Sequence, residues 1–502
     1  MTESWTPFVM LLAMIAGSVW LGTLAQRAMK GGTFLKSYFL GNRGLGAWAM
    51  ALTATVQSGG TFMGFPGIVY GFGWVGALYI AGYVIVPITA FAVLGKRLAQ
   101  MSRKLGALTV PDFLRERYGC KWVGLLASIL IVLFLTVFML AQFKAGALVM
   151  KDAFPASAAA KGVDPYLVGL GLFTLSVIAY TLIGGFLGAV WTDLLQSVLM
   201  LIGVLVLFGL VLWASGGPEH ATRLAMEKMG TDFVYAPGTK KNGDPFLPLG
   251  AAASIFIFWN FAGMGVPASL VRVMAAKDST VMRRSVAMLS VYNLLIYVPL
   301  ILISICGRSL LPDLKDADSV VPALALLTTR DIPGGSLLAG LVLSAPFGAV
   351  MATVSTFLVV VASGVVRDIY QRFINPAADD RRLKWVSRGT IVAVGAVSVV
   401  SAIWPPEYLQ TLIVLGGSLA ATAFLPPVVM GLYWRRATAS GAFASMIAGP
   451  AVVYLVYKKP ALGMGLGFFV WGLAASFLAG LAVSWATKPP PAPRLDPIFE
   501  AA

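Results

Sequence analysis

Apolar residues occur along this chain in blocks of about twenty, separated by short polar connections. A helix needs roughly 20 consecutive apolar residues to cross the hydrocarbon core of a bilayer. By this length rule the chain has about 13 spans, and the pattern predicts an all-α integral membrane protein. The predicted spans are residues 6–26, 45–70, 74–95, 122–149, 163–183, 189–214, 248–271, 286–308, 335–366, 386–404, 408–433, 437–457 and 462–486.

Two of these spans are interrupted by glycine and proline. The second contains Gln57-Ser-Gly-Gly-Thr-Phe-Met-Gly-Phe-Pro-Gly67, and the seventh contains Trp259-Asn-Phe-Ala-Gly-Met-Gly-Val-Pro267. Such residues release backbone polar groups at membrane depth, which is tolerated only around a protein-lined cavity. Broken helices in corresponding positions of two inverted halves point to a transporter site near the midplane. The alternative interpretation is that these glycines only permit close helix packing.

The distance between the two interruptions predicts the organisation of the chain. An odd number of spans separates them, so five-helix units beginning at the second and seventh spans would be inverted relative to each other. The polar stretches are too short to form a second domain with its own core. Residues 1–502 are therefore expected to form one transporter domain. Its predicted parts are an extra N-terminal helix (6–26), a first repeat (45–214), a second repeat (248–433), two C-terminal helices (437–486) and a cytoplasmic tail (487–502).

Charge adds an orientation to this arrangement. Only 12% of the residues are charged, and the formal net charge is +16. Most Lys and Arg residues fall in alternate connections, and the positive-inside rule makes these connections cytoplasmic. The N-terminus is then outside and the C-terminus inside. The positive charge reflects this topology, and we do not interpret it as a nucleic-acid surface.

Two charged side chains stand inside apolar segments. A carboxylate at membrane depth costs several kcal/mol, so Asp193 is a functional-site hypothesis by default. The alternative is that Asp193 caps or snorkels at the end of its helix. Lys144, near the outer end of the fourth span, would either act as a counter-ion to a carboxylate solute or snorkel to the interface.

The remaining polar residues favour transport over other functions. Thr353 and Ser355 lie among small residues of the ninth span, where hydroxyl and carbonyl oxygens can bind a hard cation such as Na+. A membrane-embedded enzyme would need clustered His, Asp or Glu in its spans, and a channel would show filter loops or repeated rings. We therefore expect a secondary transporter that is not an enzyme and uses no cofactor.

The residues resemble the sodium:solute symporter family over nearly the whole chain. The matching marks are Tyr38-Phe-Leu-Gly-Asn-Arg43, Gly64-Phe-Pro-Gly67, Gly184-Gly185, Trp191-Thr-Asp-Leu-Leu-Gln196, Gly265-Val-Pro267 with Arg272, Met351-Ala-Thr-Val-Ser355 and Arg367-Asp-Ile-Tyr370. This resemblance implies the LeuT-like fold, with inverted five-helix repeats and two broken helices at the midplane. It also implies residence in the plasma membrane, the inner membrane of a bacterium.

The resemblance further implies a sodium site between the second and ninth spans. The family's carbonyl donors fall on Ala54, Gln57 and Ala349, and its two hydroxyl positions fall on Ala352 and Thr353. Ala352 has no hydroxyl, so one side-chain oxygen of the pair is missing. Asp193 is similar to the family aspartate proposed to help the ion leave toward the cytoplasm.

The solute is expected to be a small organic carboxylate taken up with the inward Na+ gradient. Residues of the proline-transporting branch map to Gly60, Phe138, Trp259 and Thr356, and only Trp259 keeps its type. The pantothenate-transporting branch is more similar overall, for example at Gln142. Pantothenate is thus the first candidate, with another monocarboxylate or an amino acid such as proline as the alternative. The predicted solute contacts are Ser58, Gly60, Gln142, Trp259, Asn260 and Thr356, with Lys144 as a possible counter-ion.

Overall fold

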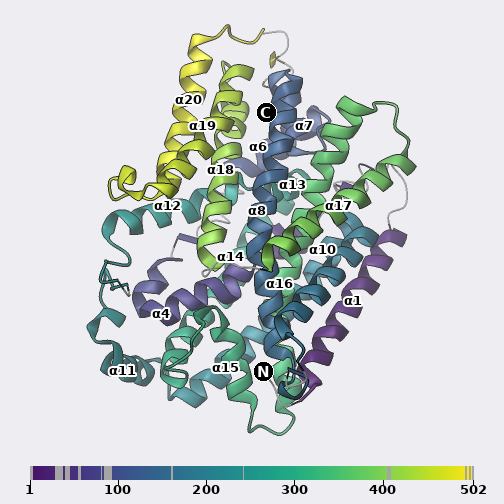
Figure 1. Ribbon diagram of the computed structural model, residues 1–502. Coiled ribbons are helices and arrows are strands. Elements are labelled where there is room, and N and C mark those ends of the chain that lie inside the picture. The colour runs from purple at the N-terminus through teal and green to yellow at the C-terminus, as the bar shows by residue number, and fades with distance from the viewer. Residues whose placement is uncertain are drawn as a thin grey trace.

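The computed structural model is a bundle of helices and contains no β-strand among the residues that it describes (Figure 1). The described residues are 4–28, 35, 38–39, 46–54, 58–80, 82–83, 93–159, 162–240, 242–403, 409–491, 495–496 and 499.

Within these residues ten helices are long and apolar enough to cross a bilayer, or eleven if the bent pair α12 and α13 counts as one span. This confirms the predicted all-α membrane protein. The ten are α1 (Thr6–Ala28), η2 with α4 (Gly60–Gly64 and Phe65–Leu78), α8 (Lys121–Ala153), α10 (Pro165–Ser215), α14 (Ser279–Leu310), α16 with η7 (Gly335–Ser363 and Gly364–Ile374), α17 (Asp380–Ala402), α18 (Leu409–Tyr433), α19 (Ala439–Lys458) and α20 (Phe468–Ala486).

Helix α10 covers two predicted spans, 163–183 and 189–214. Its 51 residues would extend about 77 Å if straight, more than twice the thickness of the hydrocarbon core. Gly185 divides it, with a φ of 53° and a ψ of −145° that side-chain-bearing residues rarely adopt. The predicted count of 13 spans stays a prediction, because the third span falls partly on residues 81 and 84–92, outside the described residues.

Both predicted interruptions coincide with helix ends. Helix α3 (Ala47–Ala54) stops before residues 55–57, which lie outside the described residues, and helical structure resumes at Gly59. Helix α12 (Leu249–Gly265) is followed by α13 (Pro267–Met274) at an angle of 48°. Pro267 lacks the backbone N–H that would continue the helix, and Val266 takes an extended conformation.

The centre of the bundle is α16, which packs against α8, α10 and α1. Every residue from Val342 to Ser363 is buried, so this part of the span meets protein on all sides. The connecting helices lie at the two ends of the bundle. Helices α11 (Pro218–Met229) and α15 (Val320–Thr329) are at one end, and α6 (Lys96–Lys104) and α7 (Val110–Tyr118) are at the other (Figure 1).

Candidate functional site

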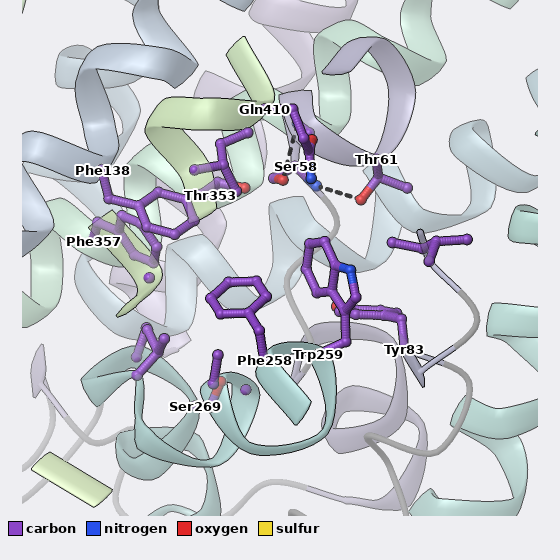
Figure 2. Close-up of a pocket in the computed structure, with 18 of the residues that line it drawn as sticks. Ser58, Thr61, Tyr83, Phe138, Phe258, Trp259, Ser269, Thr353, Phe357 and Gln410 are labelled. Carbon is purple, nitrogen blue, oxygen red and sulfur yellow. Dashed lines mark hydrogen bonds between the residues drawn. The ribbon is translucent and has the colours of Figure 1, made fainter. Parts of the chain in front are cut away.

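A cavity of about 100 Å³ lies where the two interrupted helices meet α16 and α18. Figure 2 shows Ser58, Thr353 and Gln410 along one side, with Phe258, Trp259 and Ser269 facing them. No Lys, Arg, Asp or Glu is present among the described lining residues. The side chains that give the cavity its polar and aromatic character are Ser58, Thr61, Tyr83, Phe138, Phe258, Trp259, Ser269, Tyr297, Thr353, Phe357 and Gln410.

Side chains replace the helix hydrogen bonds lost at the first interruption. The Oε1 atom of Gln142 accepts a hydrogen bond from the Gly59 N–H at 2.8 Å. The Ser58 hydroxyl accepts from the Gly60 N–H at 3.1 Å, and the Ser58 N–H donates to the Thr61 hydroxyl at 3.3 Å. These three backbone N–H groups thereby keep hydrogen-bond partners, as an interruption at membrane depth requires.

The second interruption opens directly on the cavity. Val266, Ala268 and Ser269, at the start of α13, all line it. The indole of Trp259 also lines the cavity and donates to the Tyr79 carbonyl at 2.7 Å, which fixes the ring in place. Asn260 instead turns back on its own helix and donates to the Phe256 carbonyl at 2.8 Å.

The predicted sodium ligands on α16 lie together. Ala349, Ala352 and Thr353 are buried, and Thr353 lines the cavity. The Thr353 hydroxyl donates to the Ala349 carbonyl at 3.0 Å, so two oxygens that a hard cation would use are already adjacent. The other two predicted ligands are less defined: Ala54 is the last residue of α3, and Gln57 lies outside the described residues.

The predicted solute contacts divide into two groups. Ser58, Gly60 and Trp259 line the cavity. Gln142, Asn260 and Thr356 are not among its described lining residues. Gln142 reaches the site through Gly59, and Thr356 uses its hydroxyl to accept a hydrogen bond from Arg272.

Asp193 forms a fully buried ion pair with Arg272 of α13. The Arg272 Nη2 atom is 2.6 Å from Asp193 Oδ2, and the two side chains are 1% and 2% exposed. Asp193 therefore neither snorkels nor caps a helix end, the two alternatives that its sequence position allowed. Its second oxygen, Oδ1, has no hydrogen-bond partner among the described residues. The pair links α10 to the second interrupted helix, and Thr356 adds α16 to the same contact.

Lys144 is buried in the protein and does not snorkel to the interface. Its Nζ atom is 3.7 Å from Oδ2 of Asp318, and both side chains are less than a tenth exposed. Asp318 belongs to η6 (Ala317–Ser319) and also accepts the backbone N–H of Leu409 at 3.2 Å. Burial raises the pKa of Asp318 to about 6, although the ammonium of Lys144 lowers it. Lys144 is not among the described lining residues of the cavity, so its predicted contact with solute is not seen in this arrangement.

Gln410 is a lining residue that the sequence pattern did not single out. It is 4% exposed, and neither its Oε1 nor its Nε2 has a hydrogen-bond partner among the described residues. Buried amides are normally hydrogen-bonded, so these two atoms are available to a polar ligand. The residue stands at the start of an apolar span, where a polar residue is ordinary, and only its place in the fold distinguishes it.

A cavity with polar and aromatic walls between two interrupted helices is typical of a secondary transporter. A family model described as the sodium:solute symporter family matches residues 38–449, and the chain belongs to this family. It is accordingly a Na+-coupled transporter of a solute.

Curated relatives and solved structures agree with this assignment. The sodium/pantothenate symporter of Escherichia coli (strain K12) is 32% identical over 458 residues, which cover 90% of this chain and 89% of that protein. The high-affinity proline transporter PutP of Bacillus subtilis (strain 168) is 29% identical and covers 91% of this chain and 93% of its own length. A solved structure of a Na+-coupled sialic acid symporter matches with a TM-score of 0.76 at 21% identity, covering 97% of this chain and 99% of that chain. The predicted fold class is thereby confirmed.

Proposed function

We propose that this protein uses the inward Na+ gradient to take up a small organic carboxylate, with pantothenate as the first candidate. The observation that carries the proposal is the identity of 32% and 31% to two sodium/pantothenate symporters, over 90% and 94% of this chain. The membrane is the bacterial inner membrane, with the N-terminus outside and the C-terminus in the cytoplasm.

In this proposal Na+ binds at the first interruption. Its ligands are the carbonyl oxygens of Ala54, Gln57 and Ala349 and the hydroxyl of Thr353. The adjacency of Thr353 and Ala349 supports this assignment. Ala352 supplies no hydroxyl at the second side-chain position of the site. After release from these ligands the ion passes Asp193 on its way to the cytoplasm.

The solute occupies the cavity beside this ion. Because the described lining residues carry no fixed positive charge, neutral donors must bind the carboxylate. Ser58, Ser269 and Gln410 provide hydroxyl and amide donors, and Trp259 provides an aromatic wall. The amide of Gln410 also suits the amide and hydroxyl groups of pantothenate.

The size of the cavity favours a second candidate class. Pockets for drug-sized ligands usually measure about 300–1,000 Å³, and this one measures about 100 Å³. A short monocarboxylate or proline would need less widening of the walls than pantothenate would.

Uptake by purified protein in proteoliposomes tests the proposal. Labelled pantothenate is offered with an inward Na+ gradient or with K+ replacing Na+, and pyruvate and proline are offered in parallel. Accumulation of pantothenate only with Na+ is the expected result. Na+-dependent accumulation of pyruvate or proline, with no pantothenate taken up, would overturn the pantothenate assignment and leave the Na+-coupled function intact.

A further inference from the structure

Three arginines from different parts of the chain converge on one aromatic ring near the C-terminus. The guanidinium carbons of Arg97 on α6, Arg117 on α7 and Arg435 after α18 lie 5.7, 5.2 and 5.3 Å from the centroid of Phe499. A cation within about 6 Å of an aromatic centroid is attracted by the ring quadrupole. Phe499 thus lies at the end of the bundle formed by α6 and α7, which Figure 1 shows.

Other residues of the tail add two further kinds of contact. Leu495 is 5% exposed, so its side chain is buried although it lies beyond the last span, and Phe499 packs against the hydrophobic core of the bundle. Asp496 Oδ1 is 3.4 Å from Nη1 of Arg435, which makes an ion pair. The described tail residues therefore use apolar, aromatic and acidic contacts on one small surface.

Two of the three arginines also have partners outside the tail. Arg117 donates to the carbonyls of Gly431 at 2.6 Å and Trp434 at 3.0 Å, at the end of α18. Arg97 lies over the ring of Tyr433, 4.8 Å from its centroid. Guanidinium groups held this close repel one another, and an aromatic face with a nearby carboxylate offsets the repulsion.

We propose that the surface formed by Arg97, Arg117 and Arg435 is a docking site for the chain's own C-terminal segment, through Leu495, Asp496 and Phe499. The docked segment ties α6 and α7 to the end of α18. Access to the central cavity from this side requires the helices at this end to separate. A contact that stabilises their closed arrangement lowers the population of the open one. The docked tail therefore slows transport without contacting Na+ or solute.

Hydrogen exchange on the purified full-length protein tests the docking directly. Phe499→Ala removes the ring, and Lys488→Ala is the matched control because Lys488 is an exposed tail residue before the docked segment. We expect amide exchange in residues 96–118 to be about two- to tenfold faster in Phe499→Ala, and unchanged in Lys488→Ala. Unchanged exchange in Phe499→Ala would overturn the docking.

A second variant and a lipid comparison complete the test. Asp496→Asn keeps the ring and removes the ion pair, so a smaller acceleration is expected in the same residues. Vesicles of neutral lipid and vesicles containing phosphatidylglycerol should give the same exchange in the wild type. If exchange in residues 96–118 instead responds to phosphatidylglycerol and not to Phe499→Ala, the arginines bind lipid headgroups and the proposal fails.

The effect on transport is measured separately in proteoliposomes. Phe499→Ala should raise the maximal rate of uptake about two- to tenfold and leave the half-saturating Na+ and solute concentrations unchanged. Faster exchange without faster uptake would retain the docking and overturn its restraint on transport. Because exchange is read without any solute, failure of the docking is distinguishable from a wrong solute assignment.

Discussion

The ammonium of Lys144 on α8 pairs with the carboxylate of Asp318 on η6, at 3.7 Å between Nζ and Oδ2. Asp318 also holds the N–H of Leu409, and the next residue, Gln410, faces the central cavity. The ion pair thus joins two segments that are far apart in sequence beside the start of α18. It also gives Lys144 an internal partner, whereas the sequence suggested a solute carboxylate or the interface.

Paired substitutions separate these roles of Lys144. Lys144→Met alone leaves a buried carboxylate without its cation, and removing one partner of a buried pair costs about 3–5 kcal/mol. The thermal stability of the purified protein should therefore fall in Lys144→Met and recover in Lys144→Met/Asp318→Leu. In the double variant the solute KM should stay within about threefold of wild type. A loss of solute affinity that the second substitution does not restore would make Lys144 the counter-ion after all.

The raised pKa of Asp318 makes the same pair sensitive to pH. Its ordinary value is 3.8, and burial raises it to about 6, while Lys144 lowers it and the neighbouring Asp316 raises it further. Between these two pH values the folded protein keeps a proton on Asp318, whereas the unfolded chain has already lost it. The contribution of Asp318 to stability therefore decreases as the pH rises from about 4 to 6. The melting temperature of wild type minus that of Asp318→Asn should fall across this range and be constant above pH 7. A difference that is constant throughout would contradict the raised pKa.

Thr353 is predicted to bind Na+ and not solute. Thr353→Ala removes the remaining side-chain oxygen of the proposed site, so the Na+ concentration for half-maximal uptake should rise about three- to thirtyfold. Ser344→Ala is the matched control, because the Ser344 hydroxyl lies on the same helix, donates to the Gly340 carbonyl at 2.8 Å and is not among the described lining residues. An unchanged Na+ dependence in Thr353→Ala would remove this residue from the site.

The Asp193–Arg272 pair should control turnover more than binding. Asp193→Asn keeps the shape of the side chain but removes the charge that a departing Na+ would meet. We expect the maximal rate of uptake to fall about tenfold or more, with the half-saturating Na+ concentration changed far less. The double variant Asp193→Asn/Arg272→Gln, which leaves no unpaired charge, distinguishes this effect from simple destabilisation. Full recovery of the rate in the double variant would show that only the buried charge mattered.

Gly59 is predicted to be irreplaceable because of its distance to α8. A Cβ atom at this position would lie 2.6 Å from the Cβ of Ala145 and 3.2 Å from Oε1 of Gln142. Gly59→Ala should therefore push Gln142 off the released N–H and abolish most uptake. Gly17→Ala is the control, since nothing lies within 4 Å of an added Cβ there. Uptake in Gly59→Ala equal to that of the control would mean that the first interruption tolerates a side chain.

The fold and the place of the site could be predicted from the sequence because their physical causes are local. Span length and the small residues near Gly60 and Val266 are visible in the chain itself. Pairing is different, since it depends on which helices become neighbours. The partners Arg272 of Asp193 and Asp318 of Lys144 lie 79 and 174 positions away, respectively. A buried charge predicts that a partner exists, but it does not predict where in the sequence that partner lies.

Gln410 illustrates the second limit of the sequence. A polar residue at the start of an apolar span is expected at the interface, so its type and position gave no reason to select it. Its importance arises from two amide atoms that are buried against the cavity and lack partners among the described residues. Satisfaction of hydrogen bonds is a property of the folded structure and leaves no periodic pattern in the chain.

The small volume of the central cavity also bears on leakage. A space of about 100 Å³ holds only a handful of water molecules. Each empty cycle would therefore carry little water across the membrane.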